Sequence, residues 1–322
     1  MPFTIIKGTF QARNYSPDGD SIRFHADDPL LLSNLSGPPT KINKRGDAQL
    51  RIEGIDALET HYNPPVGGAS LHQPLAIARA ARDKLLEFTG IKNVTWNTSE
   101  SVIVQADDNT RGHILTRSVD KFGRPIAFVY AGDASETDGM PVFLDAARLK
   151  QSYNLLALIE GLAYATYYQD MFASIRKTLT SAVHHARTSK LGIYKTDKTN
   201  DGFDATNISV ITDDVLILPK LFRRLSEYMV GSGTAIGFKE TLALSNEPVL
   251  DLREVNRTHF DTFVEQAPNS AHIKLTRLPE ELVFDPMPLR PVNHFAMLVT
   301  TTAPELRLAA QLASTGIRRS GD

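Results

Sequence analysis

Three short stretches of the sequence carry the residue types needed to cut a phosphodiester with the help of a divalent cation. They are Asp-Gly-Asp-Ser at residues 18–21, Leu-Arg-Ile-Glu-Gly-Ile-Asp-Ala-Leu-Glu-Thr at residues 50–60, and Asp-Lys-Phe-Gly-Arg at residues 120–124. Carboxylates are hard oxygen ligands for such a cation and can position a water. Guanidinium groups neutralise the charge that builds up on a phosphate. Together the three stretches provide both kinds of group.

Each stretch taken alone has a simpler interpretation. The Asp-Gly-Asp sequence is typical of a turn, and residues 120–124 are typical of a hairpin turn with a solvated face. Arg51 and Glu53, on an amphipathic strand, would most often be surface partners. It is the joint occurrence of the three stretches, in this order, that favours a functional site.

The elements that must position these residues are mostly strands in the first half of the chain. Alternation of apolar and polar residues predicts the strand at 48–55, short apolar-rich runs suggest the others, and apolar residues at helical spacing predict the helices, the first of which should end near Gly90. The expected strands cover residues 3–10, 21–25, 48–55, 101–105 and 125–130, and the expected helices cover residues 75–88, 154–163 and 171–186.

Strands first, one inserted helix and then closing helices indicate an α+β fold. We expect a five-stranded OB-type β-barrel with packed helices, an architecture whose open face accepts nucleic acid. A polar segment at residues 195–206 indicates a domain boundary, so we expect the barrel domain at 1–197 and a second, smaller α+β domain at 198–322 that carries no motif. Its expected elements are a strand at 208–211, helices at 215–229, 255–266 and 306–313, and strands within 273–284 that Pro279 interrupts.

Residues 1 to about 195 resemble the staphylococcal (micrococcal, thermonuclease) nuclease domain, with five matches in the right order. Residues 18–21 resemble the family's Asp-Gly-Asp-Thr, residues 51–60 its Arg…Asp-Thr-Pro-Glu-Thr, and residues 120–124 its Asp-Lys-Tyr-Gly-Arg. Residues 154–167 are similar to the helix and tyrosine segment that follow in the family. Lys-Leu-Gly-Ile-Tyr at 190–194 is similar to its closing Lys-Leu-Asn-Ile-Trp. The rest of the chain has no counterpart in that domain.

The resemblance implies a Ca²⁺-dependent nuclease that cuts DNA and RNA at the 5′ O–P bond and leaves 3′-phosphate ends, with single-stranded DNA or RNA as the favoured partner. By position, Asp20 and Asp56 would give carboxylates to calcium, and Ala57 its backbone carbonyl. Glu59 would orient or deprotonate the attacking water. The remaining implied assignments are Arg51 and Arg124 as catalytic residues on the phosphate, and Lys121 and Tyr167 as substrate-binding residues.

The sequence departs from the family pattern at several positions but keeps every catalytic group. Ala57 replaces Thr, which is tolerable where only the carbonyl binds metal. Leu58 replaces Pro, so we expect a less rigid turn before Glu59. Phe122 replaces Tyr and loses a phenol that could bond a phosphate, and Gln169 stands where the family has a second tyrosine.

The composition is that of an ordinary soluble protein and narrows the classes of partner. The 322-residue chain has a net charge of −2, whereas proteins that coat nucleic acid carry a strong basic excess, so we expect a local pocket for one or two phosphates. The absence of cysteine excludes disulfides and thiolate metal sites. No apolar run reaches the roughly 18–20 residues of a membrane helix. The N-terminus lacks a secretory signal, which favours the cytoplasm unless a signal has been removed.

Two alternatives remain open at this stage. A nuclease-like barrel can serve as a non-catalytic scaffold that binds nucleic acid or protein, but the metal carboxylates or arginines are then usually missing, and here all are present. In the other alternative, the main function belongs to the C-terminal domain, which recruits a partner or self-associates.

The adjacent His184 and His185 are expected on a helix, where neighbours do not face each other, so they should not share a metal.

Overall fold

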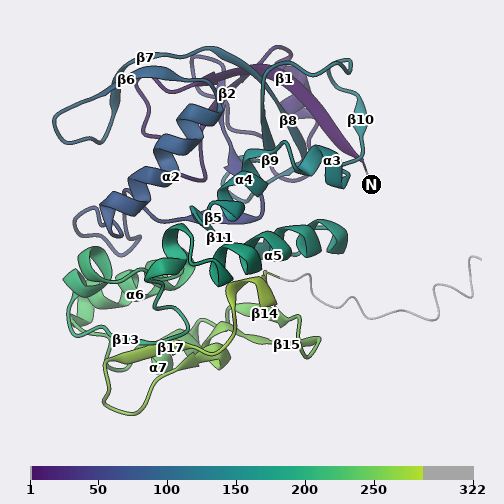
Figure 1. The fold of residues 1–322 in the computed structure, drawn as a ribbon. Coiled ribbons are helices and arrows are strands. Elements are labelled where there is room, and N and C mark those ends of the chain that lie inside the picture. The colour runs from purple at the N-terminus through teal and green to yellow at the C-terminus, as the bar shows by residue number, and fades with distance from the viewer. Residues whose placement is uncertain (1, 286–322) are drawn as a thin grey trace, which may run out of the picture. The chain divides into compact units, whose positions relative to one another are not determined.

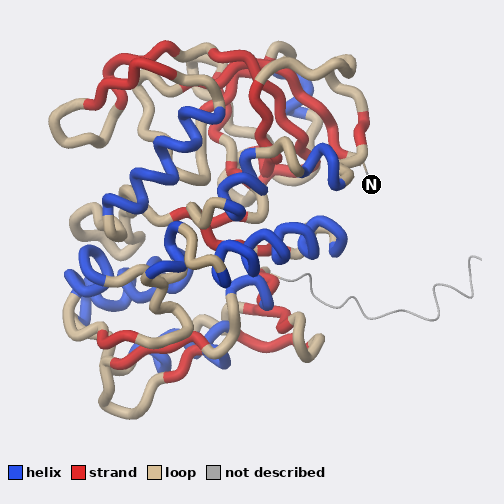
Figure 2. The backbone as a smooth tube through the Cα atoms, in the orientation of Figure 1, coloured by secondary structure: helices blue, strands red, loops and turns tan. Residues whose placement is uncertain are grey.

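A seven-stranded sheet dominates the N-terminal half of the protein and curls into a half-barrel (Figures 1 and 2). The computed structural model describes residues 2–285. The strand order is β3-β2-β1-β8-β9-β4 with β10 beside β1, and every pairing is antiparallel except that of β4 with β9. The strands are β1 (Phe3–Gln11), β2 (Arg23–Ala26), β3 (Asp47–Gln49), β4 (Arg51–Ile52), β8 (Thr110–Val119), β9 (Pro125–Ala131) and β10 (Pro141–Val142).

Large apolar side chains on both faces of this sheet are buried. Ile5 and Phe10 of β1, Phe24 of β2 and Phe128 of β9 are all completely buried. Successive residues of a strand point to opposite faces, so Ile5 and Phe10, five positions apart, lie on different faces. The predicted strands at 3–10, 21–25 and 125–130 are confirmed, and that at 101–105 is confirmed with a two-residue shift as β7 (Ile103–Asp107), paired with β6 (Lys92–Trp96).

The predicted strand at 48–55 is confirmed but is divided into short pieces. It comprises β3, β4 and the start of β5 (Ile55–Ala57). Only Leu50, which is completely buried, separates β3 from β4. Nevertheless, β3 stands at one end of the sheet order and β4 at the other, where β4 pairs with β9.

The sequence does not predict β8, which is the longest strand of the sheet. The segment lacks a clear strand pattern, because Arg111, Gly112 and His113 interrupt its apolar residues. In the structure the strand is central and is paired along its length with β1 and β9. Its buried Thr116 satisfies its hydroxyl by donating to the carbonyl of Ile126 in β9 at 2.8 Å. Tertiary pairing therefore overrides the weak local signal.

Three helices pack against the sheet and the short strands beside it (Figure 1). The helix predicted at 75–88 is confirmed as α2 (Leu75–Phe88), and that at 171–186 as α5 (Ala173–Thr188). The helix predicted at 154–163 is shorter, α4 (Tyr153–Ile159). It stops because Gly161 adopts a φ of +67° in close contact with Leu191, after which β11 (Ala163–Ala165) pairs with β5.

The C-terminal part of the described chain forms two small sheets and two helices. The helix predicted at 215–229 is confirmed with a later start as α6, and the strands within 273–284 are confirmed on both sides of a turn at Pro279. One sheet has the order β12-β18-β14-β15, and the other has the order β13-β17-β16. The elements are α6 (Pro219–Ser232), α7 (Phe238–Leu244), β12 (Tyr167–Tyr168), β13 (Phe203–Asp204), β14 (Pro248–Asp251), β15 (Asn256–His259), β16 (Val264–Glu265), β17 (His272–Leu275) and β18 (Leu282–Phe284).

Two predictions in this part are wrong. Residues 208–211 do not form a strand, because Val210–Asp214 closes a π-helical turn. Residues 255–266 do not form a helix: β15, a 3₁₀ turn at Phe260–Phe263 and β16 follow one another there. The apolar residues of this segment happen to recur at near-helical spacing, but pairing of β15 with β14 uses its backbone groups.

The mixed α+β class is confirmed, and the described residues belong to one compact unit. Within it, β18 pairs in parallel with β12 and so joins the C-terminal part to the N-terminal part. A boundary near residue 197, and a separate domain at 198–322, stay predictions. The helix predicted at 306–313 lies outside the described residues. None of the helices in residues 2–285 is long and apolar enough to cross a membrane.

Glu247 ties α6 to β14 and should give the protein a defined pH dependence of stability. Lys220 and Arg224 of α6 both ion-pair with it, Arg224 Nε at 2.9 Å. Burial raises the pKa of Glu247, but the two cations outweigh it and lower the pKa from 4.5 to about 2. We expect Glu247→Gln to lower the free energy of unfolding by about 3 kcal/mol at pH 7.

Because the folded pKa of Glu247 lies below the unfolded value, this stabilisation is fully present above pH 4.5 and is lost as the pH falls towards 2. Urea unfolding of both proteins between pH 7 and pH 3 measures the difference. A difference that did not shrink with falling pH would show that the ion pairs do not cause it.

Candidate functional site

Four carboxylates gather where the turn before β2 meets the end of β5. Asp18 and Asp20 lie in the turn that the sequence predicts, which two backbone hydrogen bonds close. Gly19 between them allows a close approach, because a Cβ there would lie 2.7 Å from the Cβ atoms of Ala57 and of Ala81. The first motif is thereby packed directly against the second.

Asp56 and Glu59 come from β5 and the turn that follows it. Asp56 is completely buried. The backbone of Glu59 is held by the buried Gln73: Glu59 N–H donates to Gln73 Oε1 at 3.2 Å, and Gln73 N–H donates to the Glu59 carbonyl at 2.9 Å. The Gln73 amide also donates to the Ile217 carbonyl at 2.8 Å. These bonds hold the backbone of Glu59 directly after Leu58.

Burial and mutual repulsion raise the pKa values of Asp18, Asp20 and Glu59. Burial raises the pKa of Asp18, and Glu59 and Asp20 raise it further. The pKa of Asp20 is raised by burial and then by Asp56. Burial also raises the pKa of Glu59, to about 7, with Asp20 and Asp56 adding to the shift. The carboxylates are therefore close enough to interact electrostatically with one another.

Arg51 lies beside this cluster, as the sequence predicts. It is placed by β4, and its guanidinium stacks over the ring of Tyr168 with 4.9 Å between Cζ and the ring centroid. Together with Arg223 and Arg124, it opposes the rise in the Asp20 pKa. Arg51 thus supplies a positive charge next to the carboxylates.

The hairpin between β8 and β9 carries Arg124 and Lys121, whose side chains lie in different surroundings. The turn is closed by Asp120, to whose Oδ2 both Arg124 Nε and Nη2 donate at 2.8 Å. Arg124 is still near enough to lower the pKa of Asp20. Lys121 is exposed, and its Nζ lies 5.4 Å from the centroid of the Phe122 ring. The structure therefore brings Arg124, but not Lys121, towards the carboxylates.

Tyr167 does not line this site, and its neighbour Tyr168 does. Tyr167 is completely buried, and its hydroxyl bonds to Thr180 Oγ1 at 2.7 Å and to the Arg176 carbonyl at 3.3 Å, both in α5. Successive residues of β12 point to opposite sides, so Tyr168 is the one that meets Arg51. Because the two tyrosines are adjacent, the sequence alone does not show which of them faces the site.

A further residue of the site, Arg223 of α6, was missed by the sequence reasoning. Arg223 Nη2 donates to Asp56 Oδ2 at 2.9 Å, and its Nη1 donates to Glu59 Oε1. It lies 164 residues or more from both partners along the chain. On an amphipathic helix outside the recognised motifs, a polar residue is expected to face solvent. No signal in the sequence distinguishes Arg223 from the other charged residues of α6.

The donor chemistry of the site fits a hard divalent cation. Asp20, Asp56 and the carbonyl of the buried Ala57 are oxygen donors of the kind that calcium prefers. Burial raises the pKa values of Asp20 and Glu59, and a bound cation would favour the ionised forms of both carboxyl groups. Within residues 2–285, no group of three or more His, Asp or Glu side chains is already arranged as a metal site. Asp56, moreover, is paired with Arg223.

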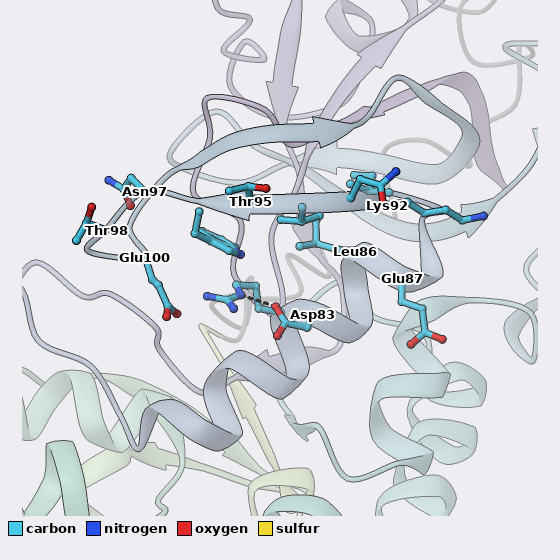
Figure 3. A pocket seen from close by; sticks show the side chains of 13 residues that line it. Asp83, Leu86, Glu87, Lys92, Thr95, Asn97, Thr98 and Glu100 are labelled. Atoms are coloured by element: carbon cyan, nitrogen blue, oxygen red, sulfur yellow. Dashed lines mark hydrogen bonds and ion pairs between the residues drawn. The ribbon is translucent and has the colours of Figure 1, made fainter.

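A hollow of about 730 Å³ between α2 and the β6–β7 hairpin is separate from this site (Figure 3). Arg82 lies over the ring of Trp96 there, with 4.0 Å between Cζ and the ring centroid, and donates to Asp83 at 2.8 Å. None of the carboxylates or arginines of the predicted site lines it. We therefore place the candidate site at the Asp18–Asp20 turn and not in this hollow.

No protein-family model matches the chain, and the curated proteins also contain no match.

Proposed function

We propose that the protein is a Ca²⁺-dependent nuclease that hydrolyses single-stranded DNA or RNA at the 5′ O–P bond and leaves 3′-phosphate ends. One observation carries the proposal: Asp20, Asp56 and Glu59, which come from two separate motifs, converge at one place next to Arg51. A structural role alone would not call for several buried or partly buried carboxylates that repel one another. Clusters of carboxyl groups with shifted pKa values are typical of catalytic and ion-binding sites.

The proposal assigns a role to each site residue that the sequence predicts, apart from Lys121 and Tyr167. Asp20, Asp56 and the Ala57 carbonyl would hold calcium, which supplies a Lewis acid next to the phosphate. Glu59 would orient the attacking water and accept its proton. Arg51 would present paired N–H donors to the phosphate oxygens. The remaining assignment is Arg124, which would add charge to the same phosphate from the β8–β9 hairpin.

We also propose that the sheet closes as a five-stranded OB-type barrel. In its strand order, β3 and β4 stand at the two ends, although they are consecutive pieces of one segment. If that segment is counted as a single strand, it pairs with β2 on one side and β9 on the other. A sheet whose first and last members are the same strand is a closed barrel. Residues 198–322 would then be an accessory domain.

The alternative, a non-catalytic scaffold, is less well supported. It would need neither the buried carboxylates nor a glutamate held in place by Gln73.

The test is direct. The purified protein is incubated with single-stranded DNA and with RNA, in calcium or in a chelator, and the ends of the products are analysed. We expect cleavage only with calcium and 3′-phosphate ends. Binding without cleavage would favour the scaffold, and undiminished cleavage in chelator would contradict the role of calcium.

The adjacent tyrosines should respond differently to substitution. Tyr168→Ala removes the ring on which Arg51 rests and a surface on which a base could stack, so we expect kcat/KM to fall about tenfold. Tyr167→Phe removes the hydrogen bond to Thr180, so we expect the free energy of unfolding to fall by about 1 kcal/mol, with cleavage unchanged. Steady-state kinetics and urea unfolding of both variants check this. Reduced cleavage by Tyr167→Phe with unchanged cleavage by Tyr168→Ala would indicate that Tyr167, not Tyr168, contacts the nucleotide.

A further inference from the structure

Arg223 binds the same carboxylate oxygens that a cation would need. Its Nη1 and Nη2 both donate to Asp56 Oδ1 at 3.2 Å, and Nη2 also donates to Asp56 Oδ2 at 2.9 Å. Nη1 reaches Glu59 as well. The guanidinium thus bridges the predicted metal ligand and the predicted catalytic carboxylate.

Because the Arg223 guanidinium already occupies Asp56, little room is left there for a metal cation. An ionised carboxylate oxygen has about two lone-pair sites, so Asp56 Oδ1 is saturated by Arg223. Calcium binds carboxylate oxygens at about 2.3–2.6 Å, and would lie within a few ångströms of the guanidinium. Asp56 is completely buried and the Arg223 side chain is only 21% exposed, so water would screen the repulsion poorly.

We propose that Arg223 is a built-in competitor for the divalent cation, and that it sets the calcium affinity of the site. Calcium binds to Asp56 after the guanidinium has moved off it. The inference rests on the proposed function, because it takes the carboxylates as a calcium site. It adds a residue of α6, from outside the nuclease-like segment, as the determinant of how tightly that site binds its ion.

The expected size of the effect follows from the competition. Apparent affinity is reduced by the fraction of molecules whose site is free to bind. If Arg223 covers Asp56 in about nine molecules of ten, its removal should strengthen calcium binding about tenfold. Isothermal titration of the full-length protein with calcium measures this without any need for activity. We expect Arg223→Gln to bind calcium at least about tenfold more tightly than the wild type.

Two further variants make the test specific. Arg224→Gln removes the neighbouring guanidinium of α6, which pairs with Glu227 and Glu247 and not with the site, so its calcium affinity should equal that of the wild type. Arg223→Lys keeps one charge but cannot bridge two carboxylates with a planar fork, so its affinity should be intermediate. It also keeps the test valid if Arg223→Gln fails to fold.

Thermal unfolding gives a second readout. In chelator, Arg223→Gln should melt at a lower temperature than the wild type, because Asp56 has lost its partner. Added calcium should raise the melting temperature of this variant more than that of the wild type.

The outcomes separate the inference from the proposed function. Equal or weaker calcium binding by folded Arg223→Gln and Arg223→Lys, with calcium-dependent cleavage intact in the wild type, overturns the inference alone. The absence of calcium binding in every variant, including the wild type, overturns the calcium site of the proposed function and the inference with it.

Discussion

Glu59→Gln should lower kcat for cleavage of single-stranded DNA by about 10²–10⁴-fold, the range usual for loss of a general base. Glutamine keeps the size of the side chain and can still accept a hydrogen bond from water, but it cannot take a proton. Because Gln73 holds the backbone of Glu59, the substituted side chain should start from the same position. Initial rates at saturating calcium, over a range of substrate concentrations, give kcat and KM separately, and we expect KM to change little.

The control for this variant is a glutamate away from the cluster. Glu265 lies exposed on β16, outside the carboxylate cluster, so Glu265→Gln should cleave at the wild-type rate. Circular dichroism of Glu59→Gln checks that the fold survives the weaker contact with Arg223. A folded Glu59→Gln protein with near-wild-type kcat would remove Glu59 from the catalytic step.

The sequence was sufficient to predict those features that rest on local patterns. The strands β1 and β2 largely alternate apolar and polar residues, β9 is a continuous apolar run, and α2 and α5 repeat apolar residues at helical spacing. The turn before β2 was predictable from Asp-Gly-Asp, since turn chemistry is set by neighbouring residues. The proximity of Asp20 to Asp56 was expected only because the two motifs occur together in the resemblance, as their separation along the chain reveals no contact.

What the sequence did not yield depends on long-range pairing. β8 is a strand because β1 and β9 lie on both sides of it, and residues 255–266 do not form a helix because β15 pairs with β14 and β16 pairs with β17. The side on which Tyr167 or Tyr168 points is set by the pairing of β12 with β18, more than 100 residues further along the chain. Arg223 enters the site through the position of α6 on the N-terminal part, which no local pattern encodes. The sequence therefore indicates the carboxylates of the site, but not Arg223, whose guanidinium pairs with Asp56 and Glu59.

Arg51→Lys should lower kcat/KM by about 10²–10³-fold, although it preserves the charge. Lysine offers a single point of charge, whereas the guanidinium presents two parallel donors that match two phosphate oxygens. Lysine also loses the planar contact with Tyr168, on which the guanidinium rests at 4.9 Å, so its charge would be held less firmly beside Asp20 and Asp56.

The matched control is Arg111→Lys. Arg111 is an exposed arginine of the same sheet that pairs with Asp27 and Asp133, so this variant should keep wild-type kcat/KM. Kinetics with a labelled oligonucleotide compare the two variants, and calcium titration shows whether Arg51→Lys still binds the ion. If Arg51→Lys cleaved as well as Arg111→Lys, a positive charge alone would be enough at this place. The fork of Arg51 could then not be the group that recognises the phosphate, and the proposed contact between this side chain and the scissile linkage would be wrong.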